Sequence, residues 1–511
     1  GKILRPDKAL RTGLVDEIVP AEQLRDAAKK LALRPRKRRK APLSQRVLNL
    51  PIVRGLVAGK IESQVRRRAR KEHYPAPYAI LDLLRRHFAS PRTGYEAEAQ
   101  SVARLVCTST SRNLVRVFFL QERLKGLGGK EPPAGGHVHV VGAGVMGGDI
   151  AAWCALRGFT VTLQDRSTEF VQPALDRARV FFEKRSRVPG RAAEQLARLQ
   201  ADVAGHGVER ADVVIEAIYE NAEAKRELYA SLEPRLKSGA LLATNTSSLM
   251  LEPLAEQLAV PGRLVGLHFF NPVAQMPLVE VVESAVTEPQ ARAAALAFTR
   301  AIDKLPLPCR SAPGFLVNRV LMPYMTEAML AAGAGVPLAT IDEVAVKFGM
   351  PMGPIELADI VGLDVCLHVG RILSAACGGP APDAVAPLVA AGKLGRKTGQ
   401  GLYEWRDGKA VKPPVAPATR VPDDLEDRLM LAMVNEAMAV LREGVVADED
   451  LIDAGVIFGS GFAPFRGGPL RYARERGVRE VVARLEALAT KHGDRFRPDP
   501  GWASFGGPGS P

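Results

Sequence analysis

The sequence predicts a doubly wound α/β domain followed by two repeated all-α units. From residue 137, strand-like runs (HVHVV, TVTLQD, DVVIEAI, LLATNTS and LVGLHFF) alternate with helix-compatible segments, the order typical of a parallel sheet covered by helices. Beyond residue 310 the pattern is mainly helical, and residues 318–359 are echoed by residues 427–474. Because neither unit of this repeat can bury its apolar face alone, we expect the two to pack as a pair.

The regions before the α/β domain are expected to be mostly helical. Residues 1–33 indicate the end of a domain, with a strand-like run at residues 14–19 and a helical pattern after it. Residues 34–130 predict a helical connecting region, in which residues 96–127 place apolar side chains at mostly helical spacing. A Pro and Gly cluster at residues 126–136 is typical of a linker.

Domain boundaries follow from these patterns. We expect the α/β domain at residues 131–310, the first helical domain at 311–405 and the second helical repeat at 423–490. Residues 406–422, rich in Pro, Ala and Lys, are expected to link the repeats. Residues 491–511 are expected to form a tail whose last part, rich in Gly, Pro and Ser, favours disorder.

Length and composition limit the class of protein. With 511 residues the chain is too long for one core, and 47% hydrophobic with 25% charged residues is typical of a soluble globular protein. No apolar run reaches the roughly 18 residues of a membrane-spanning helix and no signal peptide stands out, so we expect a cytoplasmic protein. The five cysteines are scattered without two-residue spacing, which predicts free thiols and no metal site.

The formal net charge of +14 favours polyanionic partners, and nucleic acid, anionic membranes and phosphate-bearing cofactors all qualify. Much of the excess lies in two runs, RPRKRRK at residues 34–40 and RRRARK at residues 66–71. Neither run is interleaved with the aromatic residues that stack on single-stranded nucleic acid. We therefore expect a solvated linker or helix face there, and no specific nucleic-acid partner.

A glycine turn marks the start of the α/β domain. Gly142, Gly144 and Gly147 have GxGxxG spacing between a strand-like run and a helical pattern, the context of a Rossmann-type dinucleotide site. Gly142 permits the tight turn, Gly144 lets the backbone approach the pyrophosphate, and Gly147 allows close packing of helix on strand. Asp165 ends the second strand, where a carboxylate accepts hydrogen bonds from ribose hydroxyls and repels a 2′-phosphate. NAD is therefore favoured as cofactor, although Arg166 leaves NADP open.

Five motifs follow one another between residues 137 and 320: GAGVMG, DVVIEAIYENAEAK, TNTSSL, GLHFFNPVAQMPLVEV and PGFLVNR. They resemble the L-3-hydroxyacyl-CoA dehydrogenase family, in the long form found in the α subunit of multifunctional fatty-acid oxidation enzymes. The resemblance implies an oxidoreductase of fatty-acid β-oxidation and lipid degradation, which oxidises L-3-hydroxyacyl-CoA to 3-ketoacyl-CoA with NAD. The helical repeats resemble the paired helical domains of that family.

The predicted catalytic base is His268, at the end of an apolar strand-like run. An imidazole can accept the hydroxyl proton while hydride leaves the same carbon for nicotinamide. An isolated histidine is more often structural, but here the surrounding motif favours the catalytic role. The resemblance implies that Glu280, twelve residues later, orients the ring and stabilises its charged form; the alternative for Glu280 is a surface carboxylate.

Further site residues rest on the resemblance. It implies that Ser247 and Asn318 contact the hydroxyl or thioester oxygen, which would place the substrate in a cleft between two domains. The alternatives are a helix cap for Ser247 and a capping or surface role for Asn318. Asn271 could support His268, although a turn before Pro272 competes.

The predicted cofactor and substrate contacts are completed by residues that match family positions. Lys225 could instead be a solvated helix residue, and Tyr472 could belong to the core. The cofactor set is Gly142, Gly144, Met146, Gly147, Asp165, Ile218, Tyr219, Glu220, Lys225, Ser247 and Asn271, and the substrate set is Ser247, Asn318 and Tyr472.

The opening GKILRPDKALRTGLVDEIVP resembles the end of an enoyl-CoA hydratase (crotonase-fold) domain. The family's hydratase glutamates would lie before Gly1, so we expect hydratase activity of a longer parent protein and not of this chain. The segments HYPAPYAILDLL and GYEAEA resemble the long bacterial form, whose product passes to a thiolase. The resemblance therefore implies an acyl-CoA substrate and a thiolase subunit as a partner in a hetero-oligomer.

Two other functions stay open. A dehydrogenase of a free 3-hydroxy acid would share the glycine turn and a helical second domain, and the need for a thioester discriminates it. A noncatalytic assembly subunit would use the basic runs to dock on a membrane or nucleic acid. Salt-sensitive binding without NAD turnover would favour that second alternative.

Overall fold

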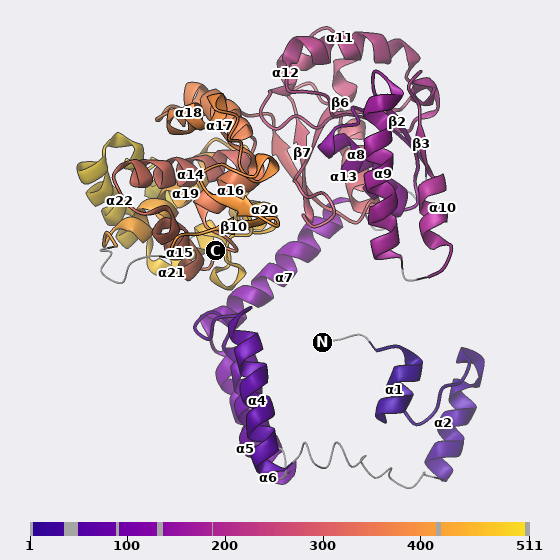
Figure 1. Cartoon of the computed structure of the whole chain (residues 1–511), viewed down its shortest axis with the longest axis vertical. Helices are drawn as coiled ribbons and strands as arrows, with labels where there is room; N and C mark the ends of the chain where they lie inside the picture. The colour runs from indigo at the N-terminus through magenta and orange to yellow at the C-terminus, as the bar shows by residue number, and fades with distance from the viewer. Residues whose placement is uncertain are drawn as a thin grey trace. The chain divides into compact units, whose positions relative to one another are not determined.

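The structure is a computed structural model that describes residues 4–34, 50–87, 91–129, 136–186, 188–414 and 421–505. It divides into two compact units, Gly1–Thr108 and Ser109–Pro511 (Figure 1). Apart from Arg34, the basic run RPRKRRK lies outside the described residues, as do residues 130–135 of the predicted linker.

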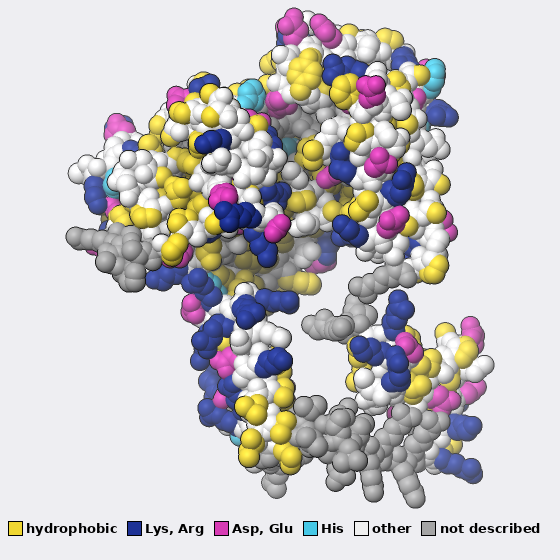
Figure 2. All heavy atoms as spheres, in the orientation of Figure 1, with side chains coloured by type: hydrophobic (Ala, Val, Ile, Leu, Met, Phe, Trp, Pro, Cys, Tyr) yellow, Lys and Arg dark blue, Asp and Glu magenta, His cyan; other side chains and the backbone are white. Residues whose placement is uncertain are grey.

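The first unit is helical in its described part. It contains α1 (Pro6–Thr12), η1 (Ala21–Gln23), α2 (Leu24–Leu33), α4 (Pro51–Arg66), α5 (Pro75–His87) and α6 (Pro91–Val106). Helix α5 packs against both α4 and α6. The second basic run begins at the end of α4 with exposed arginines, which confirms a solvated helix end, and Figure 2 shows Lys and Arg side chains gathered along these helices.

One expectation for this region is wrong. Residues 14–19 form no strand, and Leu14 is 71% exposed, because no other described strand lies alongside to pair with the segment. The helical pattern predicted over residues 96–127 is present as two helices, since α6 ends at Val106 and α7 (Ser109–Leu127) begins after a break. Some of the apolar residues at this spacing, such as Val102 and Phe118, are exposed.

The second unit contains an eight-stranded sheet in the order β3-β2-β1-β4-β5-β6-β7-β8 (Figure 1). Its strands are β1 (His137–Val141), β2 (Thr160–Gln164), β3 (Leu199–Ala201), β4 (Val213–Glu216), β5 (Leu241–Thr244), β6 (Leu264–Phe269), β7 (Leu278–Glu283) and β8 (Leu305–Arg310). All neighbours are parallel except β6 and β7, which pair antiparallel. The doubly wound α/β class is therefore confirmed.

Helices cover both faces of this sheet. One apolar core joins the strands to α8 (Val145–Leu156), α9 (Thr168–Arg185) and α13 (Pro289–Ala301). The other joins alternate strand residues to α11 (Ala222–Leu232) and α12 (Leu251–Ala255). Shorter elements around the sheet are α10 (Arg191–Ala197), η2 (His206–Arg210), η3 (Glu233–Arg235) and η4 (Pro261–Arg263).

The two helical repeats pack as a pair, as predicted. The first contains α14 (Val317–Gly333), α15 (Leu338–Phe348), α16 (Pro354–Val361) and α17 (Leu363–Cys377), and the second α19 (Leu425–Arg442), α20 (Glu449–Ser460), α21 (Pro469–Arg476) and α22 (Val478–His492). Helix α14 lies against α19, and the buried Arg428 and Glu327 form an ion pair of 3.1 Å between them. Between the repeats lie η5 (Asp383–Val385), α18 (Ala386–Ala390), η6 (Arg396–Thr398), β9 (Glu404–Arg406) and β10 (Lys409–Val411).

The repeats share one structural device, a buried aspartate that holds the start of a helix. Asp342 of α15 accepts a hydrogen bond from the backbone N–H of Ile355 at 2.9 Å, at the start of α16. Asp453 of α20 accepts one from the N–H of Leu470 at 2.8 Å, at the start of α21. Each carboxylate satisfies helix N–H groups that lack a partner within the helix.

The expected disorder of the tail is wrong for the part that the structure describes. After η8 (Asp494–Phe496), a last helix, α23 (Trp502–Phe505), packs on the second repeat, and Trp502 is 4% exposed. The Trp502 indole N–H donates to the side-chain oxygen of Asn435 at 2.8 Å. A buried indole with a satisfied N–H anchors the segment against its glycine and proline content. Residues 506–511 lie outside the described part.

Among the described residues, no single helix is both long and apolar enough to cross a bilayer. The consecutive helices α16 and α17 reach that length and composition only together, across a bend of 102°. The cytoplasmic location stays a prediction.

Candidate active site

The glycine turn between β1 and α8 leaves open space above its middle residue. Gly142 has φ 105°, and a Cβ there would lie 2.5 Å from the main-chain oxygen of Ala217. A Cβ on Gly147 would lie 1.9 Å from the oxygen of Gly142, whereas one on Gly144 would meet no atom within 4 Å. Two glycines therefore allow the strand, turn and helix to close on one another. The third keeps room for a group such as a pyrophosphate at the start of α8, while Met146 packs partly into the core.

Asp165 is oriented by the same turn. One carboxylate oxygen accepts from the backbone N–H of Ala143 at 2.7 Å, and the other from the N–H of Arg166 at 2.7 Å. Each oxygen retains a lone pair for a ribose hydroxyl. The Arg166 guanidinium lies over the Phe170 ring at 5.0 Å from the centroid.

A buried ion-pair network lies where β4 ends. The Lys225 side chain is 1% exposed, and its ammonium lies 2.6 Å from Glu216 Oε1 and 3.4 Å from Glu220 Oε2. The alternative of a solvated Lys225 is therefore wrong, because the helix α11 turns this residue inward. Glu216 is fully satisfied, since its second oxygen accepts from the Tyr229 hydroxyl at 2.8 Å and the Thr244 hydroxyl at 2.7 Å.

Glu220 shapes the loop that follows β5. Its Oε1 atom accepts from the Thr246 hydroxyl at 2.6 Å and from the backbone N–H groups of Ser247 at 2.8 Å and Ser248 at 3.2 Å. Burial alone would raise the pKa of Glu220, but the Lys225 ammonium and these donors outweigh it and lower the pKa below its usual value. Next to Glu220, Ile218 donates its N–H to Glu216, and Tyr219 is 71% exposed.

His268 and Glu280 face each other across the antiparallel pair of β6 and β7. The distance from His268 Nδ1 to Glu280 Oε2 is 2.6 Å, and both residues are buried. Glu280 Oε1 accepts from the backbone N–H groups of Leu316 at 3.0 Å and Val317 at 2.9 Å, where α14 begins. Because both carboxylate oxygens accept, Nδ1 is assigned the proton and Nε2 keeps its lone pair.

Asn318 and Ser247 join the first helical repeat to the sheet. The Asn318 side-chain amide donates to the main-chain oxygen of Ser247 at 3.0 Å, and both residues are partly exposed. Val317, which binds Glu280, directly precedes Asn318 in the chain. The start of α14 therefore contacts both Glu280 and Ser247. The four predicted catalytic residues lie at one junction between the α/β domain and the first helical repeat.

Asn271 and Tyr472 are less closely tied to this junction. Asn271 is exposed in the loop after β6 and makes no hydrogen bond to His268; the ring that lies against His268 is Phe270, with centroids 4.5 Å apart. On α21, the Tyr472 hydroxyl accepts from Arg476 at 3.2 Å and its ring packs edge-on to Phe348. Packing within the helical repeats accounts for the described contacts of Tyr472.

Sequence reasoning missed several residues that support the junction. Asn245 accepts from the backbone N–H of Phe269 at 2.9 Å and so ties β5 to the strand of His268. Lys304 donates to two main-chain oxygens of the loop between β6 and β7. The signals were a polar residue within the TNTSS motif and a lone cation within the apolar run AIDKLPLP.

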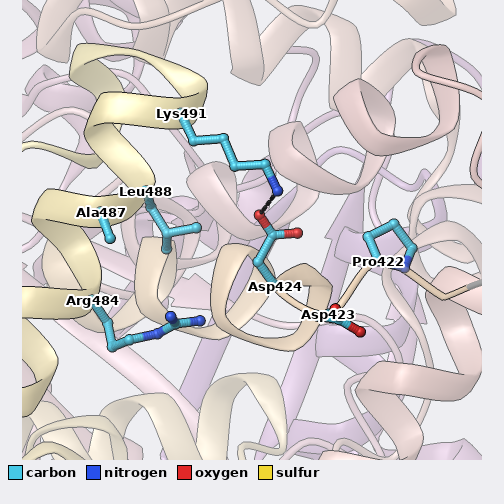
Figure 3. A pocket seen from close by; sticks show the side chains of 7 residues that line it. All are labelled: Pro422, Asp423, Asp424, Arg484, Ala487, Leu488 and Lys491. Carbon is cyan, nitrogen blue, oxygen red and sulfur yellow. Dashed lines mark hydrogen bonds and ion pairs between the residues drawn. The ribbon is translucent and has the colours of Figure 1, made fainter.

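A cavity of about 500 Å³ lies elsewhere, beside α22 in the second repeat (Figure 3). Two of its charged lining residues are paired with each other, since Lys491 contacts the Asp424 carboxylate at 2.6 Å, and His492 contacts the same carboxylate at 2.9 Å. Burial opposes these contacts, but they dominate and lower the pKa of Asp424 to about 2. The cavity is lined by Pro422, Asp423, Asp424, Arg484, Ala487, Leu488 and Lys491.

A dinucleotide turn and a buried histidine–carboxylate pair on one doubly wound sheet define a nicotinamide-dependent dehydrogenase. Residues 137–312 match the model of the 3-hydroxyacyl-CoA dehydrogenase NAD-binding domain, and residues 314–405 match that of the 3-hydroxyacyl-CoA dehydrogenase C-terminal domain. The chain belongs to the 3-hydroxyacyl-CoA dehydrogenase family, and it is an NAD-dependent dehydrogenase.

Named relatives agree with this assignment. The chain is 35% identical, over 98% of its length and 74% of the relative's, to the fatty acid oxidation complex subunit alpha of Shewanella amazonensis. A crystal structure of 3-hydroxybutyryl-CoA dehydrogenase from Escherichia coli K12 is 28% identical, with a TM-score of 0.64 over 72% of this chain and 98% of that one. A crystal structure of (S)-3-hydroxybutyryl-CoA dehydrogenase from Ralstonia eutropha is 34% identical, with a TM-score of 0.50 over 53% of this chain and 99% of that one. The resemblance and the NAD prediction are confirmed.

Proposed function

We propose that the chain oxidises the 3-hydroxyl of an L-3-hydroxyacyl-CoA to the 3-keto thioester, with His268 as the general base. The observation that carries the proposal is the hydrogen bond of 2.6 Å from His268 Nδ1 to Glu280, which leaves Nε2 as the proton acceptor. The named relatives that act on 3-hydroxybutyryl-CoA, one of them specified as the S form, support this substrate class.

Bound NAD supplies the hydride acceptor. As the C3–H bond gives up its electron pair as hydride, the hydroxyl proton passes to His268 Nε2 and the C–O bond becomes a carbonyl. Glu280 stabilises the resulting imidazolium through Nδ1. Its other oxygen is held by the N–H groups of Leu316 and Val317, so the carboxylate is fixed before the reaction starts.

Ser247 and Asn318 are proposed to hold the substrate oxygens. The Asn318 side-chain amide donates one N–H to the Ser247 main-chain oxygen. Its second N–H and its carbonyl oxygen are available to a ligand. The Ser247 hydroxyl lies 3.3 Å from Glu220 and could turn toward a substrate oxygen. Both residues are partly exposed at the domain junction, which is the accessibility that such contacts require.

The fit of NAD to the turn rests on the open space at Gly144. We assign the pyrophosphate to Gly142, Gly144, Met146 and Gly147, and the adenosine ribose to Asp165. Around the nicotinamide ribose we assign Ile218, Tyr219, Glu220, Ser247 and Asn271. Because Lys225 is fully buried, we assign it a role behind this set, where it holds Glu220 in place.

The proposal extends to a longer parent protein. The resemblance of the opening segment to the end of a hydratase domain supports an enoyl-CoA hydratase activity in that parent. The same likeness supports a thiolase subunit as partner. Both statements are tested by purifying the full-length protein with its bound subunits and assaying hydration and thiolysis.

The test of the base is NADH formation from NAD and L-3-hydroxybutyryl-CoA, with free L-3-hydroxybutyrate as the competing substrate. His268→Ala is expected to abolish NADH formation. A fluorescence titration of the same variant with NAD should still show that it binds NAD. His206→Ala, at an exposed histidine of the same domain, is the matched control and should keep full activity.

Three outcomes would contradict the proposal. Undiminished turnover in His268→Ala would exclude the base. Preference for the free acid would favour the dehydrogenase of a free 3-hydroxy acid. A folded chain that binds NAD without turnover would favour the assembly subunit.

A further inference from the structure

Lys304 is a buried cation without a carboxylate partner in the described part of the chain. It lies in the turn between α13 and β8, and it is 3% exposed. Lysine is almost never fully buried unless it is paired. Its ammonium donates to the main-chain oxygens of Val273 and, at 2.6 Å, Met276. The partners of the charge are therefore two carbonyl dipoles of one loop.

That loop closes the hairpin that carries the histidine–carboxylate pair. Strands β6 and β7 pair with His268 opposite Glu280, and the next pair is Phe269 opposite Val279. Residues 270–277 connect the strands directly after these pairs. In a hairpin the loop fixes the register, and a slip by one residue would turn each side chain to the other face. The contacts of Lys304 with this loop therefore influence how His268 is aligned with Glu280.

Other groups hold Lys304 in this orientation. Its ammonium lies 4.1 Å from the centroid of the Trp153 ring on α8, and the Trp153 indole N–H donates to the oxygen of Ile302 at 2.8 Å. Burial and the nearby Arg157 lower the pKa of Lys304 to about 8, although the neighbouring Asp303 carboxylate acts in the opposite direction. The Lys304 ammonium therefore lies in an environment that disfavours its charge. This is unusual for a side chain whose only role is packing.

We propose that Lys304 is a positioning residue of the dehydrogenase: by binding the Val273 and Met276 carbonyls it holds the β6–β7 hairpin in the register that aligns His268 with Glu280. The inference rests on the proposed role of His268 as the base. It differs from a purely structural role in its consequence, since loss of Lys304 should change the pH dependence of turnover and not only the stability of the fold.

The test compares Lys304→Met with the wild-type chain. The variant keeps an unbranched apolar side chain, one heavy atom shorter than lysine, and removes the donors. Hydrogen exchange of the backbone amides in residues 270–277 is expected to become faster, because two buried carbonyls lose their partner. The value of kcat is expected to fall about 10- to 100-fold, since misplacement of catalytic groups by about 1 Å costs that much. The NAD dissociation constant should change less than threefold.

The pH profile separates positioning from general destabilisation. With Glu280 misaligned, the charged imidazole is stabilised less, so the acid limb of kcat/KM is expected to move to lower pH in Lys304→Met. Leu296→Ala is the matched control, because Leu296 lies in the same apolar core on α13 and touches neither the loop nor the pair through a hydrogen bond. It should lower the melting temperature and leave the pH profile unchanged.

Two results would overturn the inference. Unchanged exchange in residues 270–277 of Lys304→Met would show that the lysine does not hold the loop, whatever His268 does. A variant that loses stability like Leu296→Ala, with the wild-type pH profile, would reduce Lys304 to a packing role. Failure of the proposed function is seen separately, as undiminished activity of His268→Ala.

Discussion

Asn318 donates its side-chain amide to the main-chain oxygen of Ser247 at 3.0 Å, across the boundary between the α/β domain and the first helical repeat. The residue before it, Val317, donates its backbone N–H to Glu280 at 2.9 Å. The start of α14 is thus bound both to the loop after β5 and to the strand of the carboxylate. Because the start of α14 makes both contacts, the position of the first helical repeat determines whether the site is assembled.

Asn318→Ala is therefore expected to lower kcat/KM for the acyl-CoA substrate by about 10- to 100-fold. The change removes the bond to Ser247 and the proposed contact to a substrate oxygen, and an oriented donor in an active site is worth that much or more. NAD affinity should stay within threefold, because the turn at Gly144 is untouched. Steady-state kinetics and a separate NAD titration measure the two effects.

Asn221 offers a matched asparagine for this experiment. Its side chain caps α11 by accepting from the N–H of Ala224 at 2.9 Å, so Asn221→Ala should cost about 1 kcal/mol of stability and leave kcat/KM unchanged. Equal kinetic losses in the two variants would contradict a specific role for Asn318.

Glu280→Gln is expected to reduce kcat by roughly a thousandfold to ten-thousandfold with little loss of fold. The amide oxygen can still accept from Leu316 and Val317, but an NH₂ group then faces His268 Nδ1. Because that group donates a hydrogen bond and cannot accept one from Nδ1–H, the ring is favoured in the tautomer with its proton on Nε2, and Nε2 then cannot act as the base. Stopped-flow NADH formation measures the loss, and ¹⁵N NMR of the ring reports the tautomer.

The control for this substitution lies on the same strand. Glu283 is partly exposed and forms an ion pair of 2.8 Å with Arg292, so Glu283→Gln should keep wild-type kcat. A Glu280→Gln variant with more than a tenth of wild-type activity would mean that His268 does not depend on the carboxylate.

Local patterns predicted the parts of the fold that depend on nearby residues. The glycine turn and the first strands follow from short-range spacing, and the structure has them where the sequence indicated. Strand β8 did not stand out because it contains Pro306 and Pro308, which an edge strand tolerates since one side of its backbone needs no ladder bonds. Residues 14–19 show the converse, because a short strand-like run forms a strand only where a partner strand exists.

Contacts between distant segments could not be predicted from spacing. Lys225 was expected near the cofactor or in solvent, and its burial depends on Glu216, which lies on a strand and faces α11 only after folding. The pairing of His268 with Glu280 was expected only through the family resemblance. The hydrogen bond between Asn318 and Ser247 was not expected, since the resemblance implied only that each residue contacts a substrate oxygen. Nothing in the residues alone indicates that α14 would begin beside Glu280.

Gly144→Ala and Gly147→Ala are expected to separate cofactor binding from folding. A Cβ on Gly144 meets no atom within 4 Å, so the fold should tolerate it while the NAD dissociation constant rises by about tenfold or more. A Cβ on Gly147 would lie 1.9 Å from the oxygen of Gly142, and the forced shift should cost about 1 to 3 kcal/mol or more. Thermal unfolding and NAD titration of both variants measure the difference; equal NAD affinity in Gly144→Ala and wild type would contradict the assigned pyrophosphate site.

Asp453 is expected to make the stability of the second repeat depend on pH near neutrality. Burial raises the pKa of this carboxyl from 3.8 to about 7, although Arg116 and the backbone N–H groups of Leu470 and Arg471 act in the opposite direction. Between these two values the native state binds a proton that the unfolded chain has released, so stability rises as the pH falls from about 7 toward 4. Above pH 7 the ionised group reduces stability.

Asp453→Asn should therefore flatten the change in melting temperature between pH 5 and pH 8, because the amide keeps an oxygen for the Leu470 N–H and carries no charge. Calorimetry at the two pH values measures it, and each kcal/mol corresponds to roughly 2 to 4 °C in a domain of 150–250 residues. Asp450 lies on the same helix and also contacts Arg116, but it is 45% exposed, so Asp450→Asn should leave the wild-type pH dependence intact. If Asp450→Asn and Asp453→Asn flattened the profile equally, the dependence would come from Arg116 losing a partner and not from the buried carboxyl.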